Sequence, residues 1–243
     1  MIQRRTALGL LASPLLLTGC GQGAEATEGR PAPEGAPPAG PGTPGRSAPR
    51  GIPGLGPGAT AAIPGQCRQA VVVTGRGKDS PLSTVVLHQR TAAGWQAGTA
   101  WPAHNALRGW SAHHMVDDLR SPLGVYTLSD AGGLLADPGG KLPYHRSTGF
   151  HSPGTGFVGE PLDGCFDYVI AIDYNRVPGT SPLDWTRPLG PRRGGGVWLH
   201  VDHGGPTHGC VSVAKAHMRE LLRTLDPGLR PVVVMGYADW LAV

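Results

Sequence analysis

The chain has 243 residues and a formal net charge of +4, with 39 glycines and 25 prolines. Such a glycine and proline content would argue against a buried core if it were evenly spread, but 22 of these residues fall within 21–66. The 177 residues of 67–243 are enough for one well-buried domain. The small net charge excludes a protein that binds nucleic acid through charge alone. No apolar run approaches the roughly 20 residues that span a membrane.

The first twenty residues have the features of an export signal. Arg4 and Arg5 give a positive start, residues 7–17 are apolar, and a Leu-Thr-Gly triplet leads to Cys20. This ending is similar to bacterial lipoprotein signals, which implies removal of residues 1–19 and a lipid on Cys20. We therefore expect an exported protein, lipid-anchored to the outer face of the cytoplasmic membrane. An ordinary secretory signal is the alternative, and the paired arginines leave the general secretory and twin-arginine routes both open.

Residues 21–66 consist mostly of Gly, Pro, Ala and Ser, with almost no large apolar side chains. A segment of this kind buries too little surface to offset the entropy lost on ordering. We therefore expect residues 20–66 to form a lipidated cysteine and a disordered tether, and residues 67–243 to form the folded domain.

Within that domain, short runs of alternating or β-branched residues predict a mainly β fold. The expected strands are 70–74 and 83–88, which form a hairpin, and then 124–128, 166–174, 197–202 and 231–235. The strand at 166–174 is expected to be the longest. One helix is clear from about 213 to 225, where apolar residues recur with a helical period and Asp226-Pro-Gly ends the pattern. The fold therefore has one or two short helices.

Chemically active residues concentrate in His200-Val-Asp-His-Gly-Gly-Pro-Thr-His-Gly-Cys210. Cys210 follows a glycine-rich turn and precedes the expected helix, so the helix and neighbouring imidazoles should lower its pKa and make it a nucleophile. His200 is the candidate base. Asp202 lies about 7 Å further along the same strand face and is a candidate to orient an imidazole. A cysteine beside one helix start is more often a small buried hydrophobe, but the surrounding histidines and glycines favour a reactive thiol.

The segments Leu199-His200 and Thr207-His-Gly-Cys-Val211 together resemble the catalytic motif of the YkuD-type L,D-transpeptidases. Ser121-Pro-Leu-Gly-Val-Tyr126 is similar to a further strand of that family, and the helix with the strand at 231–235 resembles its closing elements. The likeness covers roughly residues 121–236. It implies a YkuD-like β-sandwich or barrel as the catalytic domain at 67–243.

The resemblance also implies a reaction. Cys210 attacks the carbonyl of the third residue of a peptidoglycan tetrapeptide stem, the terminal D-alanine leaves, and a thioester remains. The side-chain amine of a neighbouring stem then attacks and forms a 3→3 cross-link. His200 is the implied base, and Gly209, Cys210 and His208 supply the N–H groups that hold the oxyanion. No metal or cofactor is implied, and the expected partners of this monomer are stem peptides and, through the lipid, the membrane.

The sequence departs from the family in one respect that affects the site. Only the six residues 201–206 separate the histidine from Thr207, whereas the family usually has a longer loop. The base is therefore either His200 or His203. Thr207 and Tyr144 are candidate residues of the substrate cleft, and for Tyr144 a core role is an equal alternative.

Three other functions remain open from the residues alone. His200, Asp202, His203, His208 and Cys210 are all plausible zinc ligands, and His-x-Asp-His is similar to part of the metallo-β-lactamase signature. A zinc-dependent hydrolase is therefore one alternative, although Trp198 stands where that signature has a further histidine. A non-catalytic cell-wall-binding module on the same fold is the second. The third is hydrolysis of the same thioester, with water in place of the amine.

Two cysteines remain unassigned, Cys67 and Cys165. In an exported protein they are candidates for a disulfide, which would close a loop of about 98 residues and contribute ~4 kcal/mol in the chain-entropy model. Two free thiols are the alternative.

Overall fold

The computed structural model describes residues 51–243. The signal at 1–19, the lipid site at Cys20 and residues 21–50 of the expected tether lie outside the described residues. Between residues 51 and 243, no helix combines the length and the apolar character that crossing a membrane requires.

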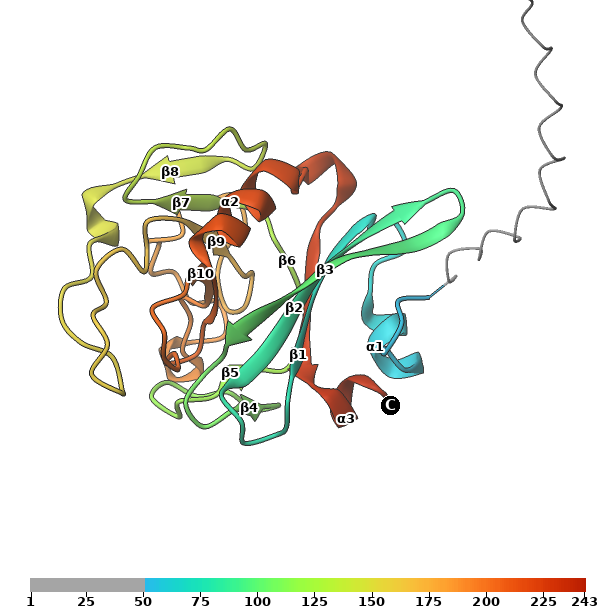
Figure 1. The fold of residues 1–243 in the computed structure, drawn as a ribbon, viewed down its shortest axis with the longest axis horizontal. Coiled ribbons are helices and arrows are strands. Elements are labelled where there is room, and N and C mark those ends of the chain that lie inside the picture. The colour runs from blue at the N-terminus through green and yellow to red at the C-terminus, as the bar shows by residue number, and fades with distance from the viewer. Residues whose placement is uncertain (1–50) are drawn as a thin grey trace, which may run out of the picture. The chain divides into compact units, whose positions relative to one another are not determined.

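A mixed sheet of ten strands dominates the domain (Figure 1). Its strand order is β6-β12-β1-β2-β3-β11-β10-β9-β7-β8. The strands are β1 (Gln69–Gly75), β2 (Leu82–Thr91), β3 (Gly94–His104), β6 (Gly124–Thr127), β7 (Ala131–Gly133), β8 (Tyr144–Arg146), β9 (Val169–Ala171), β10 (Trp198–Val201), β11 (Val211–Val213) and β12 (Val232–Tyr237). A separate pair is formed by β4 (Trp110–Ser111) and β5 (Ser121–Pro122). The expected mainly β fold is confirmed.

Three helices are described, α1 (Pro57–Ala62), α2 (Lys215–Thr224) and α3 (Ala238–Leu241), with 3-10 turns at Thr148–Phe150, Pro191–Arg193 and Pro227–Leu229. The predicted helix is confirmed as α2, but it begins at Lys215 because Val211–Val213 pair with β10 and β3 as a strand. Its predicted apolar stripe is buried at Met218, Leu221 and Leu222.

The strand predictions hold for the hairpin and fail in two places. β1 and β2 pair antiparallel as expected, with β12 parallel on the other side of β1. The strand predicted at 166–174 is not the longest: its ladder covers only Val169–Ala171, because the backbone turns at Ile172, whose carbonyl accepts the Tyr174 N–H. The longest strand is β3, which was not predicted from the sequence.

The main core draws on both halves of the curled sheet. It combines apolar side chains of β1, β2 and β12 with those of β9, β10, β11 and α2. Val197, Leu199 and Val201 are buried in it, so the alternate residues Trp198 and His200 face the other way. This alternation places His200 on the face that carries the candidate site.

The segment just before the predicted domain belongs to the fold. Residues 51–66 were expected to lie in the disordered tether, yet Ile52 and Ala59 are buried against Trp95 and Leu241 in a second core. The Gly56 N–H donates to the Leu241 carbonyl at 2.7 Å, and a Cβ at Gly56 would lie 2.3 Å from the Ala242 oxygen. The described N-terminal segment is therefore docked on α3.

Candidate active site

The turn that carries Cys210 is held from two sides. The Thr207 hydroxyl donates to the Cys210 carbonyl at 2.7 Å, and the Ser121 hydroxyl donates to the same oxygen at 3.3 Å. The Thr207 N–H donates to Asn105, whose neighbour Ala106 bridges to Thr207. Thr207, predicted for the substrate cleft, lines the cavity and is also the residue that closes this turn.

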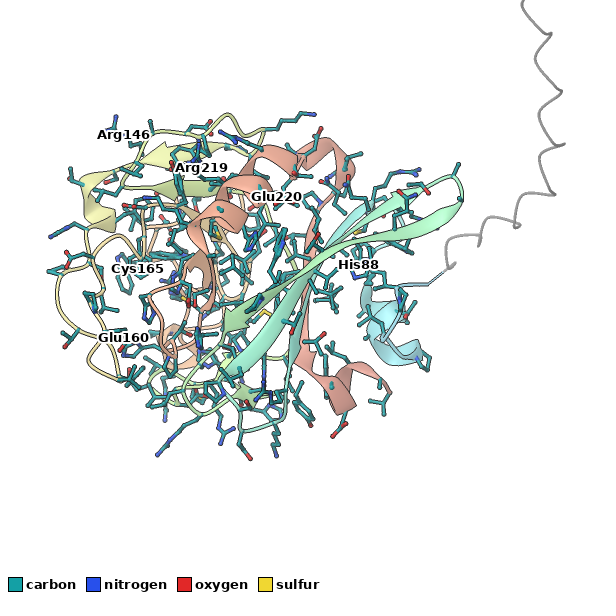
Figure 2. All side chains as sticks on the ribbon, viewed as in Figure 1. His88, Arg146, Glu160, Cys165, Arg219 and Glu220 are labelled. Atoms are coloured by element: carbon teal, nitrogen blue, oxygen red, sulfur yellow. The ribbon has the colours of Figure 1, made fainter. Side chains whose placement is uncertain are left out.

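A cavity of about 360 Å³ lies beside this turn and brings most of the predicted residues together. Cys210, His200, His203 and His208 line it, with aromatic walls from Phe157 and Trp198. Glycine-rich loops supply the rest of the lining. In Figure 2, Glu160 and Cys165 lie among these loops, and the Cys165 carbonyl accepts the Val201 N–H of β10.

The Cys210 thiol is a neutral group in this environment. Burial raises the pKa of the Cys210 thiol to about 11, and the Trp198 N–H, 3.4 Å from Sγ, lowers it only in part. The thiol itself faces the Gly196 carbonyl at 3.7 Å. The prediction of a lowered pKa is therefore wrong, because Cys210 precedes a strand instead of a helix and, within residues 51–243, no cation contributes to its pKa.

His200 is placed to accept a proton. Its Nδ1 lies 2.9 Å from the Val201 carbonyl, so Nδ1 carries the proton and Nε2 is left as an acceptor. Burial lowers the pKa of His200 to about 4, although the contact with the Val201 carbonyl opposes this shift. The imidazole is thus uncharged at neutral pH, as a general base must be.

His203 also lines the cavity, and its carboxylate partner, Glu160, was not predicted from the sequence. Its Nδ1 lies 3.0 Å from Glu160 Oε1, and its ring is parallel to that of His200 at 5.8 Å between centroids. Burial opposes the ionisation of Glu160, yet backbone N–H groups and His203 together lower its pKa. The one signal in the sequence was a lone charge within the loop Ser152–Leu162.

Asp202 does not orient a catalytic imidazole. Its Oδ1 accepts from the Ser212 hydroxyl at 2.7 Å and lies 2.8 Å from His104 Nδ1, on the far side of the loop from the cavity. The prediction for Asp202 is wrong because the chain leaves the strand at Val201 and aims the carboxylate at β3 and β11.

The backbone at the end of the turn is available to a ligand. Among the hydrogen bonds of residues 51–243, none has the N–H of His208, Gly209 or Cys210 as donor. The His208 ring packs against Phe157 at 4.6 Å between centroids. These N–H groups can hold a developing oxyanion next to the Cys210 sulfur.

Two further predictions are corrected by the structure. Tyr144 packs against the main core, where its hydroxyl donates to the Leu135 carbonyl, and it does not line the cavity. Cys67 and Cys165 are free thiols, because Cys67 lies in the second core and Cys165 lies at the cavity.

The zinc alternative finds no ligand set. Across residues 51–243 no three histidine, cysteine or carboxylate groups are arranged to hold a metal ion. Asp202 is engaged by His104 and Ser212, and His203 by Glu160. The five candidate ligands are therefore divided between two sides of the loop.

Fold and site together define a mainly β domain with two cysteines and three histidines lining one cavity. Residues 68–234 match the family model of the YkuD L,D-transpeptidase catalytic domain. The match covers more than half of the chain, and the chain belongs to this family.

The other comparisons add little. The solved structure of Bdellovibrio bacteriovorus Bd1075 is 17% identical, with a TM-score of 0.37, over 70% of this chain and 48% of that one. The chain therefore spans about half the length of that protein. A search of curated proteins found no match.

Proposed function

We propose that the domain is a peptidoglycan L,D-transpeptidase that forms 3→3 cross-links through a thioester on Cys210. Family membership supports action on peptidoglycan stem peptides. The observation that supports this mechanism is that Cys210, His200 and His208 line one cavity, next to a turn whose N–H groups at residues 208–210 have no partner among the hydrogen bonds of residues 51–243. A thiol, a neutral base and an oxyanion site are the three parts that acyl transfer requires.

In the first half of the reaction, Sγ attacks the carbonyl carbon of the third stem residue while its proton passes to His200 Nε2. The carbonyl oxygen becomes an oxyanion held by the free N–H groups of the turn. The intermediate collapses, the bond to the terminal D-alanine breaks, and the departing amine takes the proton from His200. In the second half, the side-chain amine of another stem attacks the thioester and releases the thiol.

The raised pKa of Cys210 determines how this thiol is activated. Because the resting thiol and the resting imidazole are both uncharged, the proton moves during attack on the bound substrate and no ion pair is stored beforehand. This arrangement differs from a cysteine that is already a thiolate.

Carbapenems acylate the family's thiol, so they test the assignment of Cys210. Intact-protein mass spectrometry should show one adduct on the wild type and none on Cys210→Ala. Cys165→Ala, which removes the other thiol of the cavity, and Cys67→Ala should both keep the adduct. An adduct that survives in Cys210→Ala would refute the mechanism.

We further propose that the chain is an exported, monomeric lipoprotein anchored through Cys20. The sequence ending Leu-Thr-Gly-Cys20 and the Gly/Pro-rich segment after it support this placement, which would set the domain in the cell wall. Metabolic labelling with a radioactive fatty acid should mark the wild type and leave Cys20→Ala unlabelled. Equal labelling of the two would contradict the anchor.

A further inference from the structure

His203 lines the cavity and has a carboxylate partner, Glu160. The reaction proposed above uses His200 as the base and gives His203 no role. His203 and Glu160 face each other at 3.0 Å, and their side chains are only 6% and 10% exposed. Glu160 itself does not line the cavity, whereas His203 does. Glu160 can therefore influence a bound substrate through its contact with His203 and not by direct contact.

Two glycines make room for the Glu160 carboxylate. A Cβ on Gly205, from the His203 loop, would lie 2.0 Å from Oε1, and one on Gly156, from the Glu160 loop, would lie 2.1 Å from the same atom. The Val158 N–H donates to Oε2 at 2.9 Å. The carboxylate is thus seated in a backbone cradle formed by two separate loops.

The two histidines are alike in their hydrogen bonding. Each has its Nδ1 against an acceptor, the Val201 carbonyl for His200 and Glu160 for His203, so that in each ring Nε2 is the nitrogen that takes up a proton. Their rings are stacked, with planes 4° apart. They differ in the acceptor, because a carboxylate stabilises the imidazolium that forms when Nε2 takes up a proton.

A thioester exchange has two demands for a base. The thiol must lose a proton in the first half, and the acyl acceptor must lose one in the second. We propose that His203 is a catalytic residue of the second half, taking the proton of the acceptor, and that Glu160 is its positioning residue. This assignment rests on the proposed function of Cys210.

The proposed step balances. As the acceptor nitrogen forms its bond to the thioester carbonyl carbon, the π electrons move to the oxygen and one N–H proton moves to His203 Nε2. The oxyanion then collapses, the C–S bond breaks, and the Cys210 sulfur takes the proton back from His203. The proton is then back on the Cys210 sulfur, and His203 has released the proton that it took up.

The test separates the two halves on the full chain. Formation of the carbapenem adduct reports acylation, and a quenched-flow reaction with a tetrapeptide donor and an amine acceptor reports decay of the acyl-enzyme. For His203→Gln we expect acylation within a few-fold of wild type and acyl-enzyme decay slowed by about 10²-fold or more. The acyl-enzyme should then accumulate.

Glu160→Gln should show the same split with an unchanged melting temperature, and Glu160→Asp should recover part of the lost rate. Added imidazole should restore decay in His203→Ala. His104→Gln is the matched control, because it removes another histidine paired with a carboxylate, on the side away from the cavity, and should leave both halves unchanged.

Equal loss of acylation and decay in His203→Gln, or no loss in either, would overturn the assignment. If the wild type forms no Cys210 adduct at all, the proposed function fails, and this assignment fails with it. The two failures are distinguishable because the first leaves the wild-type adduct in place.

Discussion

Alkylation of Cys210 should be slow at neutral pH in the absence of substrate. Burial raises its pKa from the ordinary value of 9.0 to about 11. Because only the thiolate alkylates, a shift of about two units lowers the reactive fraction at pH 7 about 100-fold, from about one in 10² to about one in 10⁴. The rate should then rise about tenfold per pH unit until the pH approaches the raised pKa.

The assay is iodoacetamide labelling followed by peptide mass spectrometry, which resolves Cys210 from the buried thiols of Cys67 and Cys165. A short unfolded peptide that contains the Thr207–Ser212 sequence gives the reference rate. An alkylation rate of Cys210 that levels off near pH 7 would refute the reasoning. Such a plateau would mean that the thiol is already ionised at pH 7, whereas burial favours its neutral form.

The remaining predictions concern the base and the docked N-terminal segment. His200→Ala should slow carbapenem acylation by about 10²-fold or more, far beyond His203→Ala, since it removes the neutral base of the first half; the reverse order in stopped-flow rates would move that role to His203. Ile52→Ala should lower the free energy of unfolding by about 2–4 kcal/mol, because Ile52 is 3% exposed in the second core. Urea denaturation measures these losses, with a smaller one expected for the half-buried Ile63→Ala, and an Ile52→Ala chain as stable as the wild type would contradict docking of this segment.

The parts of the fold that follow from local periodicity could be predicted from the sequence. The β1–β2 hairpin, β12 and the buried stripe of α2 all show alternation or helical spacing in their own residues. β3 does not, because most of its side chains between Gly94 and His104 are exposed, small or polar and leave no alternating pattern. Docking of residues 51–66 escaped prediction because it depends on Trp95 and the C-terminal residues.

The site was predictable as a list of residues and not as an arrangement. The sequence motif named His200 and Cys210 as base and nucleophile, and both residues line one cavity. The raised pKa of Cys210 follows from burial, and the Glu160–His203 pair spans 43 positions of sequence. Such effects depend on which loops meet in the folded chain, and no local pattern records them.

The most direct test of the central proposal is mass spectrometry of muropeptides after incubation of tetrapeptide-rich peptidoglycan with the purified chain. The wild type should release D-alanine and produce dimers joined through the third residues of two stems, and Cys210→Ala should produce neither. Unchanged peptidoglycan, or stems that lose D-alanine without forming dimers, would contradict transpeptidation by this domain.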